Sequence, residues 1–181
     1  MKFTIGHATH QGQVRDNNED AFLIDDAHDL YAIADGMGGH QGGEVASHTA
    51  IESIRASYAS GTPIEPAIEQ ANTAVITRAA SNVNLHGMGT TLTAVTVGGP
   101  NTLLFGHVGD SRAYLLHDGA LGRVTEDHSL VEDLVREGRL TPEQAEVHPQ
   151  RAIVTRALGV TDNVDVALYR VAVEAGDRVL L

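Results

Sequence analysis

Short apolar runs separated by polar turns open the chain and predict β-strands. The runs cover residues 3–5, 21–24 and 30–34, and polar residues 25–29 separate the last two. Runs of this length that are bounded by turn-forming residues are typical of strands. We therefore expect a meander of antiparallel strands near the N-terminal end.

The hydrophobic period becomes that of a helix after Gly43. Apolar residues recur every three or four positions up to the break at 61–63, and again between about residues 66 and 80. This spacing gathers apolar side chains on one face and predicts two consecutive amphipathic helices.

Strand-like runs return in the second half of the chain, at residues 90–97, 103–108, 113–116, 121–124, 164–173 and 178–181. Asp118-Gly119 is typical of a two-residue hairpin turn and favours antiparallel pairing. The polar segment 127–147 has a thin apolar stripe and a helix start at Thr141-Pro142, so we interpret it as a small helical insertion. Strands, paired helices and further strands together favour an α+β sandwich.

Composition narrows the possible partners. The 181 residues and 42% hydrophobic content suit one well-buried domain over residues 1–181. The formal net charge of -12 disfavours nucleic acid and anionic membranes, because both require clustered Lys and Arg. The chain has no cysteine, which excludes disulfides and thiolate metal sites. No run has the length of a signal peptide or a membrane span, and we expect a cytoplasmic protein.

The segment DGMGGH at residues 35–40 carries the strongest chemical signal. Asp35 follows the apolar run 30–34 and is followed at once by glycines. A carboxylate that leaves a strand into a backbone with few Cβ atoms can approach a metal ion or a phosphate closely. On these residues alone, an Asp-Gly pair after a strand is more often an ordinary turn.

Two further acids, Glu19 and Asp20, precede the strand expected at 21–24. An antiparallel meander brings them to the same sheet edge as Asp35. Converging carboxylates repel one another unless a divalent cation lies between them, and oxygen ligands with water suit Mg²⁺ or Mn²⁺ better than zinc. The alternative is that Glu19 and Asp20 form a solvated turn.

Four motifs occur in order along the chain: RDNNEDA at 15–21, DGMGGH at 35–40, GMGTTLTA at 87–94 and GDSRAY at 109–114. Together they resemble the metal-dependent protein phosphatases, the PPM or type 2C serine/threonine phosphatases, in their bacterial form. The resemblance extends from Gly6 to Leu181. It implies an α+β fold, a four-layer α-β-β-α sandwich in which helices flank two mainly antiparallel sheets.

The resemblance also implies a metal centre of two or three Mn²⁺ or Mg²⁺ ions. Its ligands would be Glu19, Asp20, Asp35, the backbone carbonyl of Gly36, and Asp110. Asp35 matches the acid that bridges two ions, and Asp110 matches an acid that helps to hold a third. As a simple turn acid, Asp110 would instead accept a neighbouring backbone amide.

The implied reaction is hydrolysis of phosphoserine and phosphothreonine in proteins by a metal-bridging hydroxide. A mechanism without a protein nucleophile fits this chain, which has neither cysteine nor a Gly-x-Ser-x-Gly elbow. Arg15, four residues before Glu19, matches the arginine that grips the substrate phosphate with paired donors, although a lone surface arginine is usually only solvated. Asp35 and Arg15 are thus the expected catalytic residues, and the implied partners are phosphorylated proteins, the substrates of bacterial Ser/Thr kinases.

The sequence departs from the family pattern in two places. Met37 stands where animal members have a histidine proposed as general acid, and His40 is the candidate to replace it. The Asp-Gly and Asp-Asn elements that complete the family's metal centre have no counterpart, because Asp118-Gly119 reads as a hairpin turn and Asp162-Asn163 as a loop. We therefore expect a C-terminally incomplete phosphatase domain. The alternative is a catalytically inactive module that binds phosphoproteins or regulates a partner.

Overall fold

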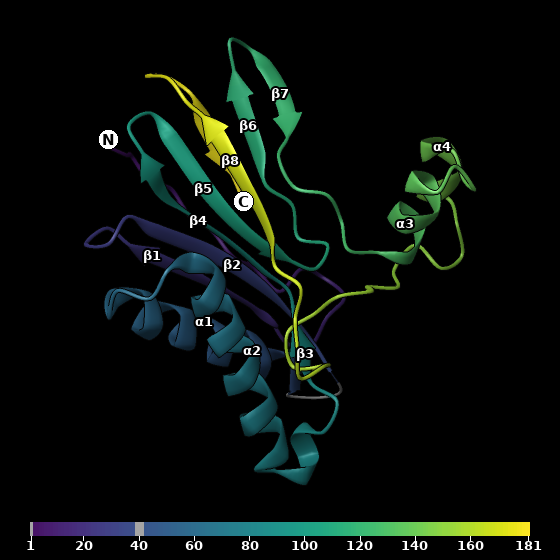
Figure 1. The fold of residues 1–181 in the computed structure, drawn as a ribbon. Coiled ribbons are helices and arrows are strands. Elements are labelled where there is room, and N and C mark those ends of the chain that lie inside the picture. Colours follow the sequence, from purple (N-terminus) through teal and green to yellow (C-terminus); the bar gives the residue numbers. More distant parts are fainter. Residues whose placement is uncertain (1, 39–41) are drawn as a thin grey trace.

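The structure, a computed structural model, describes residues 2–38 and 42–181. Its strands form two sheets, and a pair of long helices packs against the larger one (Figure 1). The larger, six-stranded sheet has the order β1-β2-β4-β5-β8, with β3 paired to β2, and each pairing is antiparallel. Its strands are β1 (Asp20–Asp25), β2 (Leu30–Met37), β3 (Gly89–Thr90), β4 (Leu92–Gly99), β5 (Thr102–Val108) and β8 (Ala167–Ala172).

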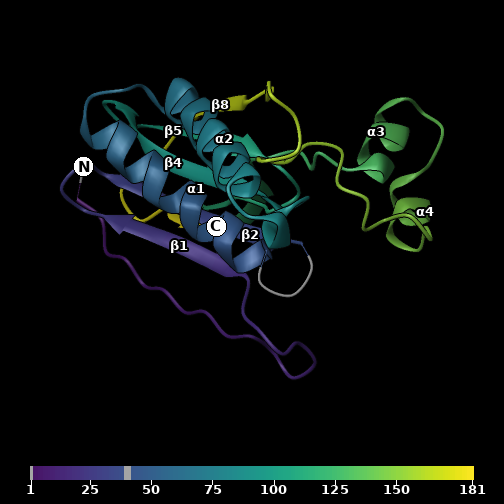
Figure 2. The same ribbon diagram turned by 90° about the horizontal axis from the view of Figure 1, so that it is seen from below.

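Helices α1 (Gly42–Ala59) and α2 (Ile64–Ala80) lie side by side on one face of this sheet (Figures 1 and 2). Their inner faces combine alanines with Ile54, Ile68 and Val75, all fully buried. Small alanine side chains let the helices approach the sheet closely, while the branched residues fill the space between. Both helices occupy the segments that the apolar period predicted, and a short 3₁₀ helix, Val83–Leu85, follows α2.

The smaller sheet contains β6 (Tyr114–His117), β7 (Ala120–Arg123) and β9 (Arg178–Leu180), in the order β7-β6-β9. Asp118 and Gly119 have positive φ angles of 48° and 80° and form the predicted hairpin turn between β6 and β7. A second core cluster includes Leu103 and Phe105 of the larger sheet and Ala113, beside β6. It joins residues from the two sheets.

Residues 3–5 do not form the predicted strand. Phe3 instead packs edge-on against Tyr31 of β2, with ring centroids 5.8 Å apart, and joins the second core cluster. Phe3 of this apolar run is thus held by partial burial of its aromatic ring rather than by strand pairing.

The polar segment 127–147 forms the predicted helical insertion, with α3 (Leu130–Arg136) and α4 (Pro142–Glu146). Ser129 caps α3, and Thr141 forms a capping box with Gln144 at the start of α4. Both helices project to one side of the sheets (Figures 1 and 2).

The predicted α+β class with two antiparallel sheets is confirmed. Within residues 2–38 and 42–181, helices cover the outer face of the larger sheet only, so three of the four predicted layers are seen. In the same part of the chain, no helix is long and apolar enough to cross a membrane.

A histidine–aspartate pair connects the tip of β6 to the turn before β9. His117 Nδ1 lies 2.8 Å from Asp177 Oδ1, and Asp177 Oδ2 accepts the Glu174 amide at 2.8 Å. The hydrogen bond to Asp177 raises the pKa of His117. The Glu174 amide, and after it His117, lower the pKa of Asp177.

This pair should make stability depend on pH. Because its pKa is raised, His117 contributes to the free energy of unfolding. This contribution is complete below about pH 6.5 and is lost as pH rises through the folded-state pKa. Because its pKa is lowered, Asp177 also contributes to the free energy of unfolding. That contribution is present above about pH 3.8 and is lost as pH falls through the folded-state pKa of Asp177. We expect urea unfolding midpoints of wild type and His117→Gln to differ most between these limits and to converge as pH rises above the folded-state pKa of His117. A difference that is constant with pH would show that the pair has no electrostatic role.

Candidate metal centre

Antiparallel pairing of β1 and β2 brings the predicted acids together. Asp20, the first residue of β1, lies directly opposite Asp35 of β2. The Gly36 amide donates to the Glu19 carbonyl at 3.1 Å, which extends the pairing by one residue. Residues that face each other across two strands have Cβ atoms about 5 Å apart. Glu19, Asp20, Asp35 and Gly36 therefore share one end of the sheet, as the meander predicted.

Two glycines allow this end of the sheet to meet the start of α1. A Cβ on Gly36 would lie 2.0 Å from the Gly43 carbonyl oxygen, and a Cβ on Gly43 would lie 2.8 Å from the Glu19 carboxylate. Neither distance is possible for a real side chain. The glycines thus place the Glu19 carboxylate against the first turn of α1, where the helix dipole favours a negative charge.

Excess negative charge surrounds Asp35. Its side chain remains accessible to solvent, yet the protein atoms crowded around it raise its pKa, and the charges of Asp20 and Asp110 raise it further. Arg15 opposes them by lowering the pKa of Asp35. A carboxylate that is open to solvent but held beside like charges suits a cation that arrives from solution.

Arg15 lies at the rim of this cluster. Its Nη1 is 3.4 Å from Glu19 Oε2, and 73% of the Arg15 side chain is exposed against 16% for Glu19. The spacing of four residues therefore brings the two side chains together. Because the ion pair is long and the arginine is mostly solvated, its guanidinium can turn toward a second anion.

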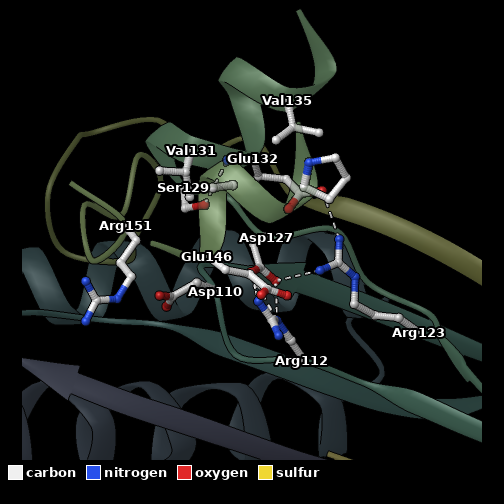
Figure 3. Close-up of a pocket in the computed structure, with 12 residues that line it drawn as sticks. Asp110, Arg112, Arg123, Asp127, Ser129, Val131, Glu132, Val135, Glu146 and Arg151 are labelled. Carbon is white, nitrogen blue, oxygen red and sulfur yellow. Dashed lines mark hydrogen bonds and ion pairs between the residues drawn. The ribbon is translucent and has the colours of Figure 1, made fainter. Parts of the chain in front are cut away.

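Asp110 follows β5 and approaches the cluster from the other side. Burial raises its pKa first, and the charge of Asp127 adds to this. Asp127 was expected only as the start of the helical insertion, but it forms a two-pronged ion pair with Arg112, at 2.9 Å from Nε and 2.6 Å from Nη2. Both residues of this pair line a cavity of about 580 Å³, together with Asp110 and residues of α3 and α4. Figure 3 shows the side chains that line it.

Two threonines hold the backbone of Asp35 from the neighbouring strands. The Asp35 amide donates to Thr91 Oγ1 at 2.9 Å, and the Asp35 carbonyl accepts the Thr91 amide at 2.9 Å and Thr90 Oγ1 at 3.0 Å. The sequence indicated only that these threonines begin a strand. Thr90 and Thr91 directly precede one apolar run, and Asp35 directly follows another. These placements were the available signal that the three residues lie at the same end of the sheet.

The described residues bring oxygen donors together but do not form a complete metal-coordination site. No group of three or more His, Asp or Glu side chains within 2–38 and 42–181 is already arranged to hold a metal ion. The donors that converge are carboxylate and backbone oxygens with surplus negative charge, which fits Mg²⁺ or Mn²⁺. Met37 is the last residue of β2, whereas His40 lies outside the described residues.

The fold is α+β, acidic residues gather at one end of its larger sheet, and sequence comparison gives the family. Residues 8–161 match the family model described as protein phosphatase 2C. The chain belongs to this family.

Bacterial serine/threonine phosphatases are among its relatives. The serine/threonine protein phosphatase PstP of Mycobacterium tuberculosis is 43% identical over 178 residues, which cover 94% of this chain and 34% of PstP. The serine/threonine phosphatase stp of Listeria innocua is 36% identical over 186 residues, which cover 96% of this chain and 73% of that protein. The chain thus spans about a third of the first relative and nearly three-quarters of the second.

A solved structure supports the fold. The catalytic domain of serine threonine protein phosphatase PstP in complex with 2 manganese ions superimposes with a TM-score of 0.78 at 40% identity, covering 93% of this chain and 71% of that one. At this similarity the arrangement of sheets and helices is shared.

The charge of Asp35 should determine metal affinity. Asp35→Asn keeps the size of the side chain but removes one negative charge and one strong oxygen donor. We expect the tightest Mn²⁺ binding step, followed by calorimetry, to weaken by at least roughly tenfold with the fold retained. Asp29→Asn is the matched control, because it removes the same charge at the opposite end of β2, where the positive φ of 51° tolerates asparagine. Unchanged affinity in Asp35→Asn would exclude Asp35 as a ligand.

Proposed function

We propose that this chain carries the catalytic centre of a Mn²⁺- or Mg²⁺-dependent phosphatase that hydrolyses phosphoserine and phosphothreonine in proteins. The observation that carries the proposal is the pairing of Asp20 with Asp35 beside Glu19, in a chain that belongs to the protein phosphatase 2C family. Three carboxylates with one exposed arginine leave a net negative site that a divalent cation would neutralise.

Each residue has a proposed task at this centre. Asp35, Glu19, Asp20 and the Gly36 carbonyl would hold the cations at this edge of the sheet, and Asp110 would contribute a further ligand. When bound, the cations supply the activated hydroxide and polarise the phosphoryl oxygens. Asp35 is held for this role by backbone hydrogen bonds on both its amide and its carbonyl.

Arg15 has the proposed task of orienting the phosphate. Its guanidinium presents planar paired donors and is held near the acids by its ion pair with Glu19. A phosphoryl group that enters beside Asp35 would offer a stronger partner, so Arg15 would exchange a carboxylate for phosphate oxygens. This keeps the substrate close to the cluster without placing a further charge inside it.

The proposed partners are phosphorylated proteins, the substrates of bacterial Ser/Thr kinases. The proposed location of this reaction is the cytoplasm. The relatives named as serine/threonine phosphatases support this substrate class. A chain without cysteine requires no oxidising compartment, which agrees with the proposed location.

A second function is favoured by one observation. Because no group of three or more ligating side chains is ready within residues 2–38 and 42–181, the chain could bind phosphoproteins without hydrolysing them. For hydrolysis, we propose that acids from further elements of the family complete the centre to which this chain contributes Glu19, Asp20 and Asp35.

Activity measurements separate the two functions. We expect little Mn²⁺-dependent turnover of a phosphothreonine peptide by residues 1–181, because Glu19, Asp20 and Asp35 supply only part of a two-cation centre. Extension by the family's remaining elements should restore turnover. A phosphopeptide bound with no turnover in either form would favour the binding module.

In the extended protein, Arg15→Ala should raise KM for the peptide by roughly tenfold and change Mn²⁺ affinity little, because a charge-assisted contact to phosphate is lost. Arg139→Ala is the matched control, since Arg139 is 68% exposed and pairs with Glu137 at 3.3 Å, much as Arg15 pairs with Glu19. If Arg15→Ala left KM and kcat at wild-type values, Arg15 would have no role in phosphate binding.

A further inference from the structure

One buried hydroxyl connects the two segments that carry the candidate acids. Thr91 Oγ1 accepts the Asp35 amide at 2.9 Å and lies 2.7 Å from Ser111 Oγ, next to Asp110. Thr91 is only 4% exposed, so water does not compete for these hydrogen bonds. The sheet order explains the contact, because Asp35 is on β2, Asp110 follows β5, and Thr91 directly precedes β4 between them.

The methyl side of Thr91 also restrains the loop that carries Asp110. Gly109, with a φ of +114°, packs so closely that a Cβ there would lie 2.5 Å from Thr91 Cγ2. Thr93 Oγ1 donates to the Ser111 carbonyl at 3.0 Å. Thr91 therefore contacts the residue before Asp110 through its methyl group and the residue after it through its hydroxyl.

His128 holds the same loop through the backbone of Gly109. The Gly109 amide donates to His128 Nδ1 at 3.1 Å, and the His128 amide donates to the Gly109 carbonyl at 2.7 Å. With one flank held by His128 and the other by Thr91, the loop has little freedom to move relative to the sheet. The contact through Thr91 links it to Asp35.

The contacts of Thr91 oppose the electrostatic repulsion between Asp35 and Asp110. Asp35 and Asp110 are both acidic, and they lie on the two segments that Thr91 joins. Like charges held close together repel each other. Without a cation, the two acids would be driven apart unless the backbone resisted. Hydrogen bonds from one side chain to both segments supply that resistance at the point where the segments meet.

We propose that Thr91 is a positioning residue whose hydroxyl sets the separation between Asp35 and the Asp110 loop and thereby tunes the affinity of the site for a divalent cation. The inference rests on the proposed metal-dependent function. Residues that orient ligands without touching the metal change its affinity by about 10- to 100-fold when they are altered.

Three variants of the chain test this role. Thr91→Val keeps the shape and removes the hydroxyl, whereas Thr91→Ser keeps the hydroxyl and removes the methyl group. Thr96→Val is the matched control, because Thr96 is also 4% exposed and its Oγ1 lies 2.7 Å from the Tyr58 hydroxyl, but neither residue is a candidate ligand. Any general effect of losing a buried hydroxyl near β4 appears in the control.

The measurements are calorimetric titration with Mn²⁺ and metal-free hydrogen exchange of the Asp35 and Gly109 amides. In Thr91→Val we expect roughly tenfold weaker Mn²⁺ binding and faster exchange at both amides, while Thr91→Ser and Thr96→Val stay close to wild type. Mn²⁺ affinity within twofold of wild type in Thr91→Val, or an equal loss in Thr96→Val, would overturn the proposal.

If wild type bound no Mn²⁺, the proposed function would fail for this chain, and the exchange data would still decide the structural link. Unchanged Gly109 exchange in Thr91→Val would then overturn it, and faster exchange that Thr91→Ser restores would support it.

Discussion

Repulsion between carboxylates at one end of the larger sheet is the constraint on which the rest of the site depends. Asp20 and Asp35 face each other across an antiparallel pair, a position where like charges destabilise a sheet. Glu19 and Asp110 add to the negative potential, and Arg15 opposes it from an exposed rim. A divalent cation would turn this unfavourable arrangement into a binding site, which is the physical basis for relating the fold to metal-dependent chemistry.

The surrounding scaffold holds the acids in place against that repulsion. Gly36 and Gly43 let the start of α1 close over Glu19, and Thr90 and Thr91 hold both backbone groups of Asp35. These contacts come from three separate parts of the chain and meet only because β2 lies next to β3 and β4. A site built on strand ends and a helix start is more rigid than one built on loops, and rigid ligands bind metal without first being ordered.

Local patterns in the sequence were sufficient for most elements but not for the contacts between them. The helical period gave α1 and α2, and the hairpin turn at Asp118-Gly119 followed from residue type alone. The run at 3–5 was misread because Phe3 packs, partly buried, against Tyr31, a tertiary contact that no local pattern contains. Likewise, the hydrogen bond from Asp35 to Thr91 spans 56 residues and depends on sheet order, so the sequence showed a strand start where the structure shows a support for the site.

The most direct test of the account is to locate a bound cation. Paramagnetic Mn²⁺ added in substoichiometric amounts to ¹⁵N-labelled protein broadens the backbone amide signals nearest to it. The account predicts that the signals of Glu19, Asp20, Asp35 and Gly36 disappear first, followed by that of Asp110, and that excess Mg²⁺ restores them. Broadening centred on another acidic region, such as Asp177 in the turn before β9, would contradict the assignment of the metal centre to the paired acids of β1 and β2.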